Sequence, residues 1–147
     1  HPPPPLLRHL LKVIFHLWWK GVQDTTGIYV STQARIGPGF YIGHFGGVVV
    51  GAGAAIGRDC NISQGVTIGW SHYQGEYGVP TLEDRVYLAP GAKVIGPITL
   101  RSGTVVGANA VVTRPTEENA VVAGIPARVI GDGGSAVYIP PDPDDDA

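Results

Sequence analysis

The chain has 147 residues, of which 44% are hydrophobic and 15% charged, and its formal net charge is −2. This length suits one domain, and so little charge leaves no basic surface large enough to follow a phosphate backbone, so we expect no nucleic-acid partner. A single cysteine excludes an internal disulfide framework and suits a reducing compartment, so we expect a cytoplasmic protein. Because the chain begins with His1 and contains no Met, we expect that this is not the native translation start.

The first predicted element is an amphipathic helix over residues 6–20, within an N-terminal segment 1–26. Leucines recur there at helical spacing, Pro2–Pro5 precede them, and Gly21 follows. Interruption by basic residues and histidines rules against a membrane-spanning helix. We favour packing across the following repeats or against a neighbouring subunit. Trp18, Trp19 and the basic residues also fit a helix at the headgroup level of a membrane, so peripheral membrane contact stays the alternative.

Aliphatic residues then recur every six positions through most of the chain. They are Val30, Ile36, Ile42 and Val48, then Val50, Ile56, Ile62 and Ile68, then Leu82, Leu88, Val94, Leu100, Val106 and Val112. A period of six fits neither a helix nor a simple strand alternation, so it indicates a repeat. The position two residues earlier is often small and apolar, as at Ala54, Cys60 and Ala92. Three six-residue walls make a turn of about 18 residues, and stacked turns form an all-β solenoid, a parallel β-helix, over residues 27–131.

Three interruptions of this period mark the predicted special features. A two-residue slip between Val48 and Val50 indicates a bulge or an altered corner. The segment from Gly69 to Thr81 predicts one protruding loop of the kind that solenoids use for binding. After Val112 the repeats fade into a segment that looks like a terminating cap, and residues 132–147 read as an acidic C-terminal tail. Cys60 occupies an inward position and is predicted to be a packed thiol.

Several motifs resemble those of a known family. IGHFGGVVVG, ISQGVTIG, LAPGAKVIGPITL, GANAVVT and AGIPARVI, together with the hexapeptide repeats, resemble the left-handed β-helix acyltransferases. The closest likeness is to the serine acetyltransferase branch and its polysaccharide-biosynthesis relatives. The resemblance implies a left-handed solenoid, a homotrimer, acetyl-CoA as the donor, and active sites between adjacent subunits.

The resemblance also assigns a catalytic residue. His44 in IGHFGG matches the family's catalytic histidine. An alcohol holds its proton at neutral pH, so acetyl transfer to a hydroxyl needs a base, and we expect His44 to supply it. Neither a nucleophilic cysteine nor a Ser-His-Asp order indicates an acyl-enzyme, so direct attack on the thioester is the simpler scheme.

Two departures from the family's pattern bear on the acceptor. Serine acetyltransferases typically have Asp before the catalytic His and Arg-His before the Pro that closes the loop, whereas this chain has Gly43 and Gly78-Val79. We therefore expect a saccharide or glycan-precursor hydroxyl as the acceptor, with serine as the alternative. The loop residues predicted to bind such an acceptor by stacking and hydrogen bonding are His72, Tyr73, Glu76 and Tyr77.

Residues expected to bind acetyl-CoA follow from the same resemblance. The family holds the pantetheine chain along a groove between coils, which requires small residues. The matching positions are Ala89, Pro90, Gly107 and Ala108, with Gly69 and Trp70 at the start of the loop. The CoA phosphates need cations near the last coils, and Arg114 and Arg128 are the candidates.

Two other classes of protein stay open as alternatives. A β-helical metalloenzyme of the carbonic anhydrase type requires three converging histidines, but only His44 and His72 lie in the coil region, so we expect no metal. A non-catalytic β-helix scaffold predicts no affinity for CoA. The combination of IGHFGG with IPAR is not expected in a scaffold that has no catalytic site.

Overall fold

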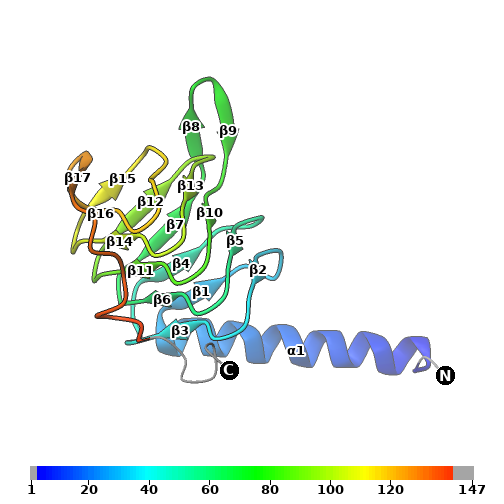
Figure 1. Ribbon diagram of the computed structural model, residues 1–147. Coiled ribbons are helices and arrows are strands. Elements are labelled where there is room, and N and C mark those ends of the chain that lie inside the picture. Colours follow the sequence, from blue (N-terminus) through cyan, green and yellow to red (C-terminus); the bar gives the residue numbers. More distant parts are fainter. Residues whose placement is uncertain (1–2, 141–147) are drawn as a thin grey trace, which may run out of the picture.

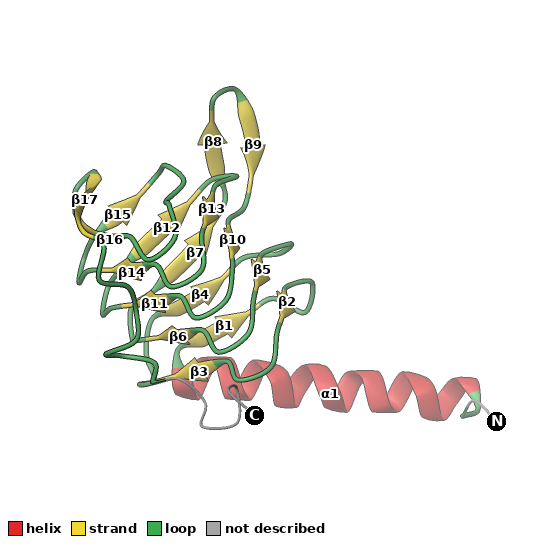
Figure 2. Ribbon diagram, viewed as in Figure 1, coloured by secondary structure: helices red, strands yellow, loops and turns green. Residues whose placement is uncertain are grey.

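The computed structural model describes residues 3–140 and contains one helix followed by a β-solenoid (Figure 1). The helix, α1 (Pro5–Thr26), extends sideways from the base of the solenoid. The strands are short, and they stack in parallel from turn to turn (Figure 2). The predicted parallel β-helix is therefore confirmed.

The solenoid has three walls, each built from strands of successive turns. The first wall contains β1 (Ile28–Val30), β4 (Val48–Val50), β7 (Thr67–Gly69), β12 (Lys93–Ile95) and β15 (Val111–Val112). The second contains β2 (Arg35–Ile36), β5 (Ala55–Ile56), β10 (Thr81–Leu82) and β13 (Thr99–Leu100). The third contains β3 (Tyr41–Ile42), β6 (Asn61–Ile62), β11 (Tyr87–Leu88), β14 (Val105–Val106), β16 (Val121–Gly124) and β17 (Ala127–Gly131).

The core is the column of inward aliphatic residues that the period of six predicts. Val50, Ile68 and Val94 stack along the first wall, and all three are fully buried. The small inward positions, including Ala54 and Cys60, are buried beside them. Full burial of one such aliphatic side chain stabilises the fold by about 1.5–3 kcal/mol. Because each turn covers the apolar face of its neighbour, the core is continuous along the solenoid.

The predicted slip between Val48 and Val50 is wrong in its position. Both residues belong to the straight strand β4, and both are buried. Val50 pairs with Ile68, eighteen residues later, whereas Val30 pairs with Val50, twenty residues later. The two extra residues lie in the corner before β4. A count along the sequence placed them too late because Val48 and Val50 both point inward.

The segment from Gly69 to Thr81 is an ordered β-hairpin rather than an irregular loop. Strand β8 (Ser71–Tyr73) pairs in antiparallel fashion with β9 (Glu76–Gly78). Gln74 and Gly75 connect them, and both have positive φ, at 50° and 85°. Two consecutive left-handed residues are what a two-residue hairpin turn requires. The hairpin leaves the solenoid between β7 and β10, in the middle of the stack of turns, and points away from α1 (Figure 1).

Helix α1 continues beyond its predicted end at Lys20. Gly21 lies within the helix, and Gly27 ends it with a φ of 65°, donating its N–H to the carbonyl oxygen of Gln23 at 2.9 Å. None of its residues is buried, so α1 does not pack across the repeats, which was one of the two placements we favoured. It contacts the solenoid mainly at β1. Within residues 3–140 no helix is long and apolar enough to cross a membrane.

The end of the solenoid carries the predicted cap. Strand β16 extends the third wall beyond Val112, and β17 folds back on it in antiparallel fashion. The following residues pack against the solenoid, so the predicted tail does not begin at residue 132. Tyr138 stacks on Tyr87 with ring centroids 4.3 Å apart, and Arg85 donates a 2.5 Å hydrogen bond to the carbonyl oxygen of Ile139. The DPDDDA sequence lies outside the described residues.

Candidate functional site

His44 lies in a corner that is two residues longer than the corresponding corners above it. Gly43 donates its N–H to Ile62 O at 2.9 Å, and Gly46 O accepts from Gly65 N at 2.9 Å. One turn later, the N–H of Ser63 and the carbonyl oxygen of Gln64 make the corresponding bonds, and these two residues are adjacent in the sequence. The chain therefore bulges only at His44 and Phe45, and both side chains are exposed.

Glycines with positive φ stack from turn to turn beside this bulge. A Cβ at Gly47, whose φ is 65°, would lie 3.4 Å from the Cα of Gly65, and Gly65 stands in the same relation to Gly91. The column of glycines keeps successive turns in register directly beside the bulge. His44 therefore sits on a regular support, at the edge where the third wall meets the first wall. We call this the His44 edge.

Four of the residues predicted to bind acetyl-CoA lie on the same edge. Ala89 donates its N–H to Val106 O, and Asn109 donates to Pro90 O, both at 2.9 Å, which stacks the Ala89–Pro90 corner beneath the Gly107–Ala108 corner. The side chains at these positions are small. The structure therefore places these small residues on the same edge as His44, and Ala89 among them is buried.

The other predicted residues lie along the opposite edge of the first wall, from which the hairpin projects. We call this the hairpin edge. Gly69 ends β7, and Trp70 begins the hairpin. The ring of Trp70 lies 3.4–3.5 Å from where a Cβ of Gly51 would be, so it rests on the turn below. His44 precedes the first wall and the hairpin follows it, so a single chain does not bring them together.

The four residues predicted to bind the acceptor divide between the two faces of the hairpin. His72 pairs with Tyr77, and their ring centroids are 4.7 Å apart. Tyr73 pairs with Glu76 on the other face, as strand alternation requires. Tyr73 is half-buried and packs against the core, whereas Glu76 is exposed. The stacking surface of the hairpin therefore consists of Trp70, His72 and Tyr77, with Trp70 in place of Tyr73.

The two predicted phosphate-binding arginines line one hollow. Arg114 follows β15 and Arg128 lies in β17, and the structure brings them to the same depression of about 140 Å³. The rest of its lining is apolar, including Val112 and Val122, except for Thr116. Two guanidinium groups beside an apolar wall form a site that can hold phosphate groups.

Cys60 is not a nucleophile in this fold. Its thiol is buried and donates a hydrogen bond from Sγ to the carbonyl oxygen of Glu83 at 3.1 Å. Burial raises the pKa of this thiol from its ordinary value of 9.0 to about 11. The prediction of a packed thiol is therefore confirmed.

Metal ligands do not gather in the part of the chain that the structure describes. Within residues 3–140, no group of three or more His, Cys, Asp or Glu side chains is placed to hold a metal ion. His44 and His72 belong to opposite edges of the first wall. Residues 3–140 thus do not form the three-histidine arrangement of a β-helical metalloenzyme.

Phe45 is a site residue that the sequence reasoning missed. Its ring is 78% exposed beside His44 and belongs to the same insertion. The available signal was the spacing from Ile42 to Val50, eight residues where six are regular. That count shows that two residues between Ile42 and Val50 are extra, and the turn-to-turn bonds of Gly43 and Gly46 identify them as His44 and Phe45.

Comparison with known proteins identifies relatives of this chain. No protein-family model matches it. The serine acetyltransferase of Mycobacterium tuberculosis is 45% identical over 106 residues, which cover 72% of this chain and 46% of that protein. The chain is similar in sequence to the serine acetyltransferases. It spans about half the length of the curated relatives it matches, with shares of 46%, 48% and 52%.

Solved structures agree with this likeness. A serine acetyltransferase in complex with cysteine matches with a TM-score of 0.74 and 31% identity, over 86% of this chain and 52% of that one. Another, in complex with CoA, matches with a TM-score of 0.61 and 38% identity, over 67% and 40%. The resemblance to the hexapeptide-repeat acyltransferases is thereby confirmed. These matches give no support to the more specific likeness to polysaccharide-biosynthesis enzymes.

Proposed function

We propose that this chain is the catalytic solenoid of an acetyl-CoA-dependent O-acetyltransferase and that its acceptor is the hydroxyl of serine. The observation that carries the proposal is the position of His44. It lies in a two-residue insertion on the accessible edge of a solenoid that is 45% identical to a serine acetyltransferase. This acceptor was our alternative from the sequence, and the names of the relatives favour it over a saccharide.

In the proposed reaction His44 acts as a general base. Its imidazole takes the proton of the acceptor hydroxyl as that oxygen attacks the thioester carbonyl of acetyl-CoA. The resulting tetrahedral intermediate collapses by breaking the carbon–sulfur bond. The protonated imidazole then returns its proton to the CoA sulfur. The products are an acetyl ester and free CoA, and general base catalysis of this kind contributes about 10²–10⁴-fold.

We further propose that a homotrimer completes the site. The His44 edge carries the base and the small residues for pantetheine, while the hairpin edge carries the aromatic surface. A head-to-tail interface that closes into a ring would place the His44 edge of one subunit beside the hairpin edge of the next. Arg114 and Arg128, which line one hollow, would pair with the phosphates of CoA.

A second acceptor class, saccharide hydroxyls, is favoured by one specific observation. Gly43 precedes His44, and Gly78 and Val79 precede Pro80, so these positions supply no charge for the ammonium and carboxylate of serine. The hairpin instead presents the rings of Trp70 and Tyr77, which are 45% and 62% exposed. Aromatic faces of this kind can stack on a sugar ring.

The test is an acceptor screen with acetyl-CoA that follows release of free thiol across serine, other amino acids, sugars and sugar nucleotides. Turnover with serine supports the proposal, whereas turnover with sugars alone moves the acceptor to the second class. His44→Ala should abolish turnover while CoA binding persists. If no acceptor is turned over and CoA does not bind, the non-catalytic scaffold is the correct alternative.

A further inference from the structure

Helix α1 presents an apolar face that nothing in the described chain covers. None of its 22 residues is buried. Leu6, Leu17 and Trp18 are 82%, 70% and 67% exposed, and Leu10 and Ile14 are each 53% exposed. An apolar strip of this length on a single helix indicates an interaction surface.

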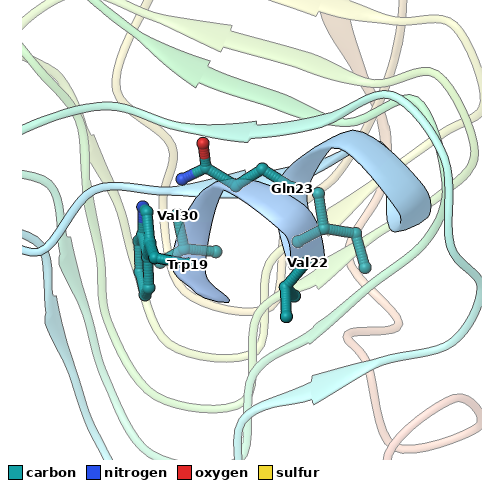
Figure 3. Close-up of a pocket in the computed structure, with 5 residues that line it drawn as sticks. Trp19, Val22, Gln23 and Val30 are labelled. Carbon is teal, nitrogen blue, oxygen red and sulfur yellow. The ribbon is translucent and has the colours of Figure 1, made fainter. Parts of the chain in front are cut away.

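Part of the apolar face points away from the solenoid. Near the C-terminal end of α1, Trp19, Val22 and Gln23 line a hollow together with Ile28 and Val30 of β1, so these residues mark the side of the helix that meets the solenoid (Figure 3). At about 100° per residue, Leu10 and Leu17 lie on the opposite side of the helix. A flat partner centred on Leu10 and Leu17 would therefore lie on the side of α1 away from the solenoid.

The remaining face of α1 is basic. Arg8, Lys12 and Lys20 lie there with two histidines, and of the three Arg8 and Lys12 are on the side that faces the solenoid. No Asp or Glu precedes Asp24 in the chain. Asp24 pairs with Lys20 at 3.0 Å near the C-terminal end of the helix, and both side chains are well exposed. The first four turns of the helix therefore carry positive charge with no acidic side chain to balance it.

We propose that α1 binds the surface of an anionic phospholipid bilayer. The helix lies in the plane of the interface with its apolar face among the acyl chains. The basic residues are at the headgroup level, and the solenoid stands on the water side. Trp18 has the amphipathic ring that such helices place at the boundary. The helix does not cross the bilayer, in agreement with the absence of a spanning helix among residues 3–140.

Charge decides between a membrane and a second copy of the chain. A pair of α1 helices packed by their apolar faces would leave both basic faces in solvent, with no opposite charge to balance Arg8, Lys12 and Lys20. The apolar face, which spans about half of the helix circumference, is also wider than the narrow seam that one partner helix covers. A bilayer covers the whole face and supplies the opposite charge.

The test is co-sedimentation of the full chain with vesicles of phosphatidylcholine alone and of equal parts phosphatidylcholine and phosphatidylglycerol. We expect binding to the anionic vesicles that weakens as salt is raised. Neutralising Arg8, Lys12 and Lys20 to Gln should lower the partition coefficient by about fivefold per residue. Leu17→Glu should lower it by at least about tenfold.

The matched control is Val137→Glu, because Val137 is an apolar residue that is 88% exposed outside α1. This variant should bind vesicles as the parent does. Thermal unfolding of the Leu17→Glu variant should be unchanged, because Leu17 is not buried. Equal binding to both kinds of vesicle, or binding that Leu17→Glu leaves intact, would overturn the proposal. Loss of a larger oligomer in the Leu17→Glu variant, without vesicle binding by the parent, would assign the face to a second copy.

Discussion

Trp70 and Tyr77 are the first and last residues of an eight-residue insertion, and their rings stack on each other with centroids 5.2 Å apart. Ile68 pairs with Val94, twenty-six residues later, where a regular turn takes eighteen. Gly78 to Pro80 resume the path that Ala52 to Ala54 follow one turn earlier. The stacked pair thus closes the base of the hairpin and lets it stand on an otherwise uninterrupted solenoid.

We predict that Tyr77→Ala loosens the hairpin without unfolding the solenoid. It removes a ring stack worth about 0.5–1.5 kcal/mol, whereas Tyr77→Phe retains it. The measurement is the emission of Trp70 in a background where Trp18 and Trp19 are replaced by Phe. Emission should shift toward that of exposed tryptophan in Tyr77→Ala only, with an unchanged unfolding midpoint. An unshifted spectrum in the Ala variant would show that the stack does not hold Trp70.

Removal of both His44 and Phe45 should leave a folded but inactive solenoid. Without them, Ile42 and Val50 are six residues apart, which is the regular spacing, and Gly43 and Gly46 keep their bonds to the next turn. Thermal unfolding should match or exceed that of the parent, and acetyl transfer should be lost. Deletion of Phe45 alone is the control, because it leaves one unpaired residue in the corner. A large loss of stability in the double deletion would contradict the assigned insertion.

The buried thiol of Cys60 should make stability fall at alkaline pH. Its pKa is about 11 in the folded chain against 9.0 ordinarily, so the unfolded chain loses this proton first as pH rises. The stabilisation is complete below pH 9 and is lost progressively up to pH 11, by about 2–3 kcal/mol. Denaturant unfolding across this range measures it. Cys60→Ala should lack this part of the decline because it has no thiol to titrate. The variant should fold, since Ala fills the equivalent inward positions at Ala54 and Ala92.

Glu83 should contribute stability at neutral pH that disappears in acid. Its Oε1 accepts a 3.0 Å hydrogen bond from Arg101 Nη1, and its Oε2 accepts one of 3.0 Å from Ser102 N. The hydrogen bond from Arg101 lowers the pKa of the Glu83 carboxyl below its ordinary value of 4.5. A lowered pKa means that the stabilisation is present above pH 4.5 and is lost as pH falls through the folded value.

The measurement for Glu83 is the difference in unfolding free energy between the parent chain and Glu83→Gln as a function of pH. This difference should shrink as pH falls below 4.5. Arg101→Gln in the same series should remove most of the pH dependence. A difference that stays constant down to strongly acidic pH would show that the ion pair does not shift the carboxyl.

Much of the candidate site was predictable because it depends on local departures from a regular period. His44 and the hairpin interrupt a spacing of six. Arg114 and Arg128 line one hollow because the cap folds back on the last turn. The sequence located Phe45 and Trp70 within the site less accurately than it located His44. Counting along the chain locates an insertion only to within a few residues, since valines at neighbouring positions fit the period equally well.

By itself, the sequence determined the solenoid, its inward residues and the chemical types at its irregular corners, because inward positions recur with the backbone period and need no long-range information. The tertiary structure alone decided which edge each candidate residue occupies. It separated His44 from the hairpin by the width of the first wall, and it placed Leu10 and Leu17 of α1 on the side away from the solenoid. Both results depend on how the strands stack and on where α1 meets β1, and the six-residue period of the sequence encodes neither.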